Sequence, residues 1–264
     1  MMRKRLVASA LTAAALLIVS SGILAQTAAP QGTANAGAPD LTGVWRRSRK
    51  PPDTSRPYTF HEIAGTLTNE KPPMTPWGEE KYKAAKPNIG SHGVPLSQTN
   101  DPVTKCFPPG VPRIYEMRVG QPLEIIQVPG RVIMFFEYDH LVRQIFTDGR
   151  QHSEDITPSF MGDSIGKWEG DTLVVDTIGF NDKTWLDGEG LPHSDALHLV
   201  ERIRRVSPDA LTIDFTIDDR KAYTKPWVAH HLFDLKPGWN IGEVVCVDDN
   251  ANFLGTEKML ESGK

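Results

Sequence analysis

The sequence of 264 residues predicts an all-β protein, an antiparallel barrel with an irregular, proline-rich wrap at its N-terminal side. Between residues 123 and 235, short apolar runs rich in β-branched residues alternate with turn sequences, such as those at residues 169–171 and 207–209. No segment of any length repeats its apolar residues with helical periodicity. A barrel of about eight strands leaves room for one small ligand.

Residues 1–25 have the three parts of a secretory signal peptide: a basic start at residues 3–5, an apolar run at residues 6–19 and a cleavage site at residues 23–25. A membrane anchor is the alternative, but the apolar run is shorter than the ~20 residues that a span needs. We therefore expect a periplasmic or secreted protein whose mature chain has no membrane span.

Residues 26–39 are rich in Ala, Thr, Gly and Pro, which predicts a flexible linker. Residues 40–264 are then expected to form a single β-barrel domain, since barrels of roughly 200–250 residues often stay undivided. The signal segment contains three of the 29 basic residues and none of the 33 acidic ones, so the rest of the chain has a net charge of −7. This charge, without a large basic patch, argues against a nucleic-acid partner, and the oligomeric state stays open.

Cys106 and Cys246 are the two cysteines of the chain. In an oxidising compartment such a pair usually forms a disulfide bond, here between an N-terminal loop and the last strand. Free thiols are the alternative. A cysteine nucleophile is not favoured, because prolines closely follow Cys106 and no helix start is present to activate the thiol.

The elements are expected in the following order. A first strand covers residues 41–45, where Gly43 and Trp45 form a Gly-x-Trp pattern. Prolines throughout residues 50–100 forbid long ladders, and one helix is expected from Thr75 to Lys86. Strands follow at residues 123–128, 131–138 and 141–147, on both sides of the turn at 169–171, at 197–206 and 211–217, and around residue 227.

Glu201 lies in an apolar row with Leu197, Leu199 and Ile203 on one face of its strand. An unpaired buried carboxylate would cost several kcal/mol, so Glu201 needs either a partner or a raised pKa. An arginine is the alternative that would lower the pKa: Arg205 on the same face or Arg143 from another strand.

Several kinds of chemistry lack their motifs. The histidines have no metal-ligand spacing, so we expect no metal, and the chain contains no Rossmann fingerprint, phosphate loop or Gly-x-Ser-x-Gly elbow. We therefore expect no cofactor. What remains is general acid–base chemistry near the long Gly- and Asp-rich loop at residues 179–194, which carries Trp185 and His193. His193 and Glu201 are candidate proton donor and acceptor, whereas each residue alone could equally be structural.

Five segments resemble a family: DHLVR at residues 139–143, DGRQH at 148–152, GKWEGDTLVVDTIGF at 166–180, LPHSDALH at 191–198 and YTKPW at 223–227. They are similar to a large, mostly uncharacterised family of exported lipocalin-like β-barrel proteins from acidobacteria and proteobacteria. The resemblance covers about half of the chain and implies a lipocalin-like barrel, supports the Cys106–Cys246 bond and brings no established reaction. Arg220 departs from the proline that is usual in the family. The recurrent polar positions of the family match His140, Arg143, His152, Asp176, His193 and Glu201.

We expect an exported, cofactor-free acid–base enzyme, a hydrolase, lyase or isomerase, acting on a small organic molecule in a barrel pocket. The alternatives are a lipocalin-like binding protein for a small apolar or aromatic ligand, and an envelope protein whose polar motifs stabilise loops. The candidate catalytic residues are His193, Glu201, Asp139 and Asp176. The candidate substrate-binding residues are His140, Arg143, His152 and Trp185.

Overall fold

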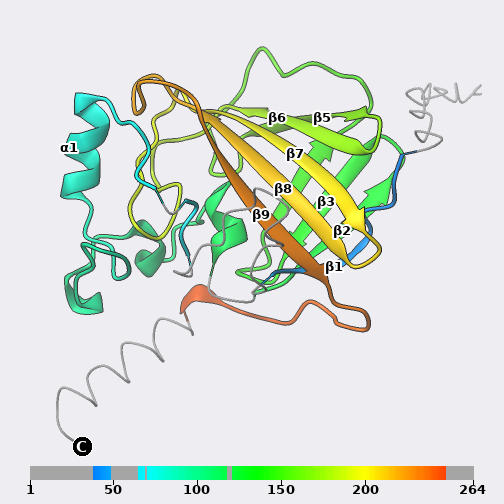
Figure 1. Cartoon of the computed structure of the whole chain (residues 1–264), viewed down its shortest axis with the longest axis horizontal. Coiled ribbons are helices and arrows are strands. Elements are labelled where there is room, and N and C mark those ends of the chain that lie inside the picture. Colours follow the sequence, from blue (N-terminus) through cyan, green and yellow to red (C-terminus); the bar gives the residue numbers. More distant parts are fainter. Residues whose placement is uncertain (1–37, 49–64, 69, 118–120, 248–264) are drawn as a thin grey trace, which may run out of the picture. The chain divides into compact units, whose positions relative to one another are not determined.

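Nine strands form a closed barrel in which each strand pairs with its neighbours in sequence and the first pairs with the last (Figure 1). The strands are β1 (Gly43–Arg47), β2 (Leu123–Val128), β3 (Arg131–Phe136), β4 (Val142–Phe146), β5 (Asp163–Glu169), β6 (Thr172–Ile178), β7 (His198–Ser207), β8 (Ala210–Asp218) and β9 (Trp227–Leu235). The all-β barrel that the sequence predicts is confirmed.

The computed structural model describes residues 38–48, 65–68, 70–117 and 121–247. The expected signal peptide and most of the expected linker lie outside these residues. In the described part of the chain, no helix is both long enough and apolar enough to cross a membrane.

The turn at residues 169–171 joins β5 to β6 as expected. Glu169 pairs with Thr172, and Gly170 between them has φ +61°, a conformation that glycine adopts without a steric cost. The β7–β8 turn at residues 207–210 is likewise closed by a pair between Ser207 and Ala210. Local turn chemistry therefore sets the register of both hairpins.

One pairing departs from the predicted antiparallel order. Strands β4 and β5 run parallel and meet at a single residue pair, Phe146 with Ile165. A closed ring with an odd number of strands cannot alternate direction throughout, so nine strands require at least one parallel pair. The long connection at residues 147–162 supplies the crossover that parallel neighbours need.

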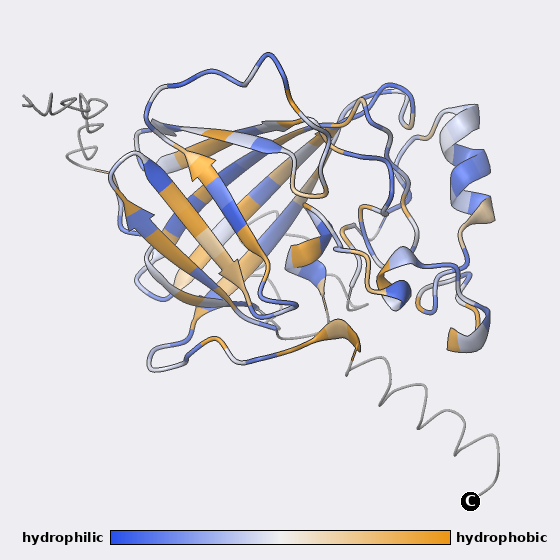
Figure 2. Cartoon of the chain, turned by 180° about the vertical axis from the view of Figure 1, so that it is seen from behind, coloured by the Kyte–Doolittle hydropathy of each residue, from blue (hydrophilic) through white to orange (hydrophobic). Residues whose placement is uncertain are grey.

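Alternate residues of the strands point into the barrel. Leu173 and Val175 on β6, and Leu199, Glu201 and Ile203 on β7, are all buried, whereas the residues between them are more exposed. Figure 2 shows this alternation of hydrophobic and hydrophilic positions along the strands. The period of two thus produces an inner wall that is apolar except for a few polar side chains.

Trp45 is fully buried, as the Gly-x-Trp pattern suggests. Its indole nitrogen donates to the carbonyl oxygen of Leu41 at 2.8 Å, and the guanidinium of Arg205 lies over its ring, 5.4 Å from the centroid. The amphipathic indole thus has its polar edge satisfied and its face covered by a cation.

The described part of the proline-rich segment contains helix α1 (Pro76–Ala84) and the short 3₁₀ helices η1 (Leu96–Gln98), η2 (Pro102–Lys105) and η3 (Arg113–Glu116). Thr75 caps α1 by accepting a hydrogen bond from the amide of Gly78, as expected. The amide of Thr75 donates to Ala222, and Met74 bridges to Tyr223, so this segment is held against the connection between β8 and β9.

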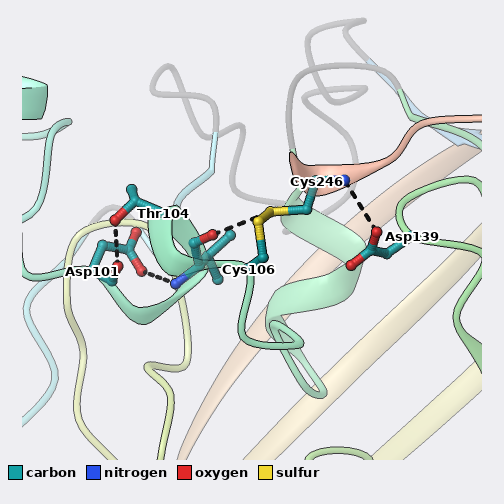
Figure 3. The surroundings of a disulfide bond; sticks show 6 residues. Asp101, Thr104, Cys106, Asp139 and Cys246 are labelled. Atoms are coloured by element: carbon teal, nitrogen blue, oxygen red, sulfur yellow. Dashed lines mark hydrogen bonds between the residues drawn. A yellow bond between two sulfur atoms is a disulfide. The ribbon is translucent and has the colours of Figure 1, made fainter. Parts of the chain in front are cut away.

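Cys106 and Cys246 form a disulfide bond with a Cα–Cα distance of 5.6 Å (Figure 3). Near this bond, the amide of Cys246 donates to the carboxylate of Asp139 at 3.1 Å, and the amide of Asp139 donates to Val244 at 2.7 Å. The bond itself is as expected, but Cys246 lies beyond β9 and not in the last strand. The chain beyond β9 is therefore held covalently to the end of η2 and by hydrogen bonds to the β3–β4 turn.

Candidate functional site

The eight residues that the sequence singles out lie in four places. Arg143 and Glu201 are inside the barrel, and His152 and Asp176 are on its outer wall. Asp139 and His140 form the β3–β4 turn, and Trp185 and His193 lie in the loop between β6 and β7.

Inside the barrel, Arg143 on β4 forms a two-pronged ion pair with Glu201 on β7. Its Nη1 donates to Oε1 of Glu201 at 2.8 Å, and its Nη2 donates to Oε2. Nη2 also donates to Thr177 at 2.9 Å, and Nε donates to Ser164 at 3.2 Å. The sequence left Arg205 and Arg143 as possible partners of Glu201, and the partner in the structure is Arg143.

Tyr115 of η3 completes this internal network. Its hydroxyl accepts from Nη1 of Arg143 at 2.9 Å and donates to Oε1 of Glu201 at 3.1 Å. The ring packs against three phenylalanines of the barrel wall: Phe136 on β3, Phe215 on β8 and Phe233 on β9. Contacts with strands on several sides of the barrel place the Tyr115 ring in its interior.

The electrostatics of the network favour a fixed protonation state. Burial lowers the pKa of Arg143, but the carboxylate of Glu201 more than offsets this, so the pKa lies above its usual range. Burial and then Glu201 raise the pKa of Tyr115, so the phenol keeps its proton. Both groups therefore hold their protons at neutral pH, which favours a structural role over proton transfer.

A second polar cluster, made of His152, Asp163, Asp176 and His198, lies on the outer face of β5, β6 and β7. His152 comes from the connection between β4 and β5, and its Nδ1 lies 2.7 Å from Oδ2 of Asp163. Its Nε2 lies 3.0 Å from Oδ1 of Asp176, and the other oxygen of Asp176 lies 3.0 Å from Nε2 of His198. We call these four residues the outer cluster.

The outer cluster is reachable from solvent, unlike the network inside the barrel. The side chains of Asp176 and His198 are each 41% exposed. Burial raises the pKa of Asp176, but hydrogen bonds from His198 and His152 outweigh burial and lower it, so this carboxylate is ionised at neutral pH. Nε2 is the nitrogen of His198 that contacts Asp176, and Nδ1 makes no hydrogen bond to another described residue.

Asp139 and His140 have structural contacts. Both adopt positive φ, 54° and 50°, in the β3–β4 turn. Asp139 holds the backbone of Cys246, while Nε2 of His140 lies 3.2 Å from the carbonyl of Gly242 and its ring stacks on Phe135. These two residues anchor the segment that follows β9.

The loop between β6 and β7 is held by buried polar groups. His193 contacts Oγ1 of Thr184 and the carbonyl oxygen of Ser194, each at 3.2 Å, and burial lowers its pKa, so its ring is neutral at pH 7. Trp185 stacks under the guanidinium of Arg113 at 5.5 Å. The polar contacts of His193 and those of Glu201 involve different residues, so each belongs to its own local network.

Asp187 fixes the same loop. Its carboxylate is fully buried and accepts three backbone amides, from Leu67, Glu189 and Leu191, at 3.0–3.2 Å. Burial raises its pKa to about 6, although the amides of Leu67 and Leu191 oppose the shift. A buried carboxylate thus ties the long loop to the backbone of Leu67 in the N-terminal segment.

Among the ionisable residues of the internal network and the outer cluster, three were not sequence candidates: Tyr115, Asp163 and His198. A usable signal existed for His198, because the period of two places it on the face opposite Leu197 and Leu199, and therefore outward. The same pattern places Asp176 outward on β6, next to β7. No local pattern points to Tyr115, which reaches Glu201 across 86 residues of chain.

Comparisons with protein-family models, with curated proteins and with solved structures gave no match. Among the described residues, no group of three or more His, Cys, Asp or Glu side chains is arranged to hold a metal ion.

Proposed function

We propose that this protein is an exported acid–base enzyme acting on a small organic molecule, and that its reactive group is the imidazole of His198. The observation that carries the proposal is the pairing of Nε2 of His198 with the carboxylate of Asp176, in a position open to solvent. A hydrolase, a lyase or an isomerase would each use a histidine in this way.

The pairing defines the tautomer of His198. An ionised carboxylate only accepts hydrogen bonds, so Nε2 of His198 carries the hydrogen that Asp176 accepts. The lone pair then resides on Nδ1, where it can take a proton from a substrate or from water, and Asp176 stabilises the imidazolium that results. Such a positioned base contributes typically 10²- to 10⁴-fold to a rate.

The outer wall supports this chemistry better than the barrel interior does. Inside the barrel the Tyr115 ring packs among three phenylalanines, and the carboxylate of Glu201 is saturated by Arg143 and Tyr115. A substrate would have to displace η3 before it could reach Glu201, whereas it can approach His198 directly.

Export is the second part of the proposal. The disulfide bond between Cys106 and Cys246 is typical of proteins that work in an oxidising compartment. Together with the signal-peptide pattern of residues 1–25, it favours the periplasm or the extracellular space.

The exchange His198→Asn tests the catalytic proposal, and His230→Asn is its matched control. His230 on β9 also pairs with a carboxylate on the next strand, Asp214, at 2.9 Å, and the two side chains are 33% and 35% exposed. p-Nitrophenyl acetate serves as the first substrate, followed by a panel of lactones and small esters. We expect kcat/KM to fall by at least about 100-fold for His198→Asn and to stay unchanged for His230→Asn. Equal rates for the two variants would refute the role of His198.

The competing function is a carrier of a small apolar or aromatic ligand, which would take the place of the Tyr115 ring inside the barrel. A carrier predicts that an apolar fluorescent probe binds more tightly to Tyr115→Ala than to the wild type, with no effect of His198→Asn. The same two variants therefore separate the two functions.

A further inference from the structure

His152 is the member of the outer cluster with the most constrained surroundings. It lies in the connection between β4 and β5, and its ring is inserted between two carboxylates, Asp163 on β5 and Asp176 on β6. Its side chain is 18% exposed, less than half of the value for His198. Both ring nitrogens thus face an oxygen at hydrogen-bond distance.

Counting hydrogens fixes the charge of this ring. Ionised carboxylates have no hydrogen to donate, and a neutral imidazole has a single N–H. Two hydrogen bonds, one to Asp163 and one to Asp176, therefore require both nitrogens of His152 to carry a hydrogen. The ring that satisfies this geometry is the imidazolium.

The electrostatic balance agrees with the count. Burial lowers the pKa of His152, but the two carboxylates outweigh burial and raise it above the usual histidine value. The ionisable groups around the ring are Asp163 on β5, Asp176 on β6 and, beyond Asp176, His198 on β7. On its own segment, Arg150 is paired with Asp148 and also lies within the field of Asp163.

We propose that His152 is the positioning residue of the catalytic site, acting as an imidazolium that clamps Asp176 against His198. The kinetic part of this inference rests on the proposed function of His198, whereas the imidazolium bridge itself can be tested without any substrate.

The clamp follows from the contacts of Asp176, whose two carboxylate oxygens each face a different histidine. Oδ1 faces His152 and Oδ2 faces His198, so the carboxylate plane is fixed from both sides. When His152 loses its proton, one of its two hydrogen bonds must break, because a single N–H cannot serve two acceptors. Asp176 then loses one of its two restraints, or the β4–β5 connection loses its bond to β5.

The first experiment measures the charge of His152 by NMR of the full-length protein with ¹⁵N-labelled histidine. The ring signals are assigned by their loss in His152→Gln. We expect both nitrogens to be protonated at pH 7 and the measured pKa to fall in Asp163→Asn, which removes one charge but keeps the shape. A neutral ring at pH 7, or a pKa that Asp163→Asn leaves unchanged, would overturn the imidazolium bridge. His230 should titrate identically in both proteins.

The second experiment measures the pH profile of kcat/KM with p-nitrophenyl acetate. If His152 must be charged, activity declines at high pH with the pKa that NMR gives for His152. Asp163→Asn then moves this decline to lower pH by as much as it lowers the NMR pKa of His152. His152→Gln should lower kcat by about 10- to 100-fold with little change in KM, because it displaces the base His198 and leaves substrate binding unchanged. A profile unmoved by Asp163→Asn would refute the positioning role. If the wild type turns over neither p-nitrophenyl acetate nor the panel of lactones and esters, the hydrolase form of the proposed function fails, and the NMR titration still decides the bridge.

Discussion

Arg143 and Glu201 place two opposite charges inside the barrel, where neither side chain reaches solvent. Removing such charges from water costs several kcal/mol each, and their attraction repays this only if the remaining donors are satisfied. The contacts with Tyr115, Ser164 and Thr177 meet that condition. The buried pair is therefore tolerated as a unit, whereas either charge buried without its partner would destabilise the fold.

This coupling predicts the stability of single and double variants. Glu201→Leu should lower the free energy of unfolding by about 3–5 kcal/mol, because it leaves Arg143 buried and unpaired. The double variant Arg143→Met/Glu201→Leu should recover most of that loss. Urea unfolding measures each value.

The exposed pair of Arg202 and Glu169, 3.1 Å apart with side chains 47% and 48% exposed, is the control for these variants. Glu169→Leu should change the free energy of unfolding by less than about 1 kcal/mol, since surface ion pairs contribute little. Similar losses for Glu201→Leu and Glu169→Leu would show that burial of the Arg143 charge does not decide the outcome.

At the residue scale, the sequence could predict that Glu201 is buried and needs a partner, because its apolar row repeats with a period of two. It could reduce the choice to two arginines, but not decide between them, since Arg143 reaches Glu201 only through barrel closure. It placed His193 and Glu201 as candidates for one proton relay, whereas His193 contacts Thr184 and Ser194 and Glu201 contacts Arg143 and Tyr115. Side-chain contacts across the barrel depend on closure, which local patterns do not specify.

The element with the largest effect on the interior is the short helix η3. Its side chains are all buried, and three of them contact ionisable side chains: Arg113 contacts Asp101, Tyr115 contacts the Arg143–Glu201 pair, and Oε1 of Glu116 lies 2.5 Å from Nδ1 of His231. A single 3₁₀ turn thus links the N-terminal segment to the inner wall of the barrel.

Tyr115→Phe should destabilise the protein by about 1–3 kcal/mol, because it removes the hydroxyl that bonds both Arg143 and Glu201. Tyr115→Ala should cost about 3–5 kcal/mol, since it also leaves a cavity among the phenylalanines. Tyr82→Phe in α1, where the ring is half-buried and the hydroxyl bonds Ser91 and no buried ion pair, should cost less than about 1 kcal/mol. Thermal and urea unfolding of the three variants provide the comparison, and equal effects of Tyr115→Phe and Tyr82→Phe would exclude the hydroxyl network as a source of stability.

Among the elements, the two hairpins β5–β6 and β7–β8 could be predicted because their turns and their apolar alternation are both local. The parallel contact between β4 and β5 could not, since it depends on the total number of strands. The same long connection that permits this contact also carries His152 to the outer wall. The contacts of His152 with Asp163 and Asp176 therefore could not be predicted, whereas the alternation along β6 and β7 was a local signal for placing Asp176 and His198 on the outer face.

For the whole molecule, the outer cluster and the interior network lie on opposite faces of the same strands. On β7, His198 points outward and Glu201 inward, three positions further along the chain. A stable, saturated interior fixes the strands whose outer faces carry the proposed chemistry. The sequence singled out some of the polar residues of these two networks, while barrel closure decides on which side of the wall each of them lies.

The disulfide bond between Cys106 and Cys246 makes a covalent ring that contains β2 to β9 and leaves β1 outside it. β1 pairs with β2 and with β9 through three residue pairs on each side, and Trp45 is its fully buried side chain. β1 lies outside the segment that the disulfide bond closes, so a cut between β1 and Cys106 would leave it held by non-covalent contacts alone. A protein cut at a protease site inserted between residues 48 and 65 should keep this strand until a synthetic peptide of residues 38–48 displaces it. A peptide with Trp45→Ala should compete poorly, and the exchange can be followed by mass spectrometry.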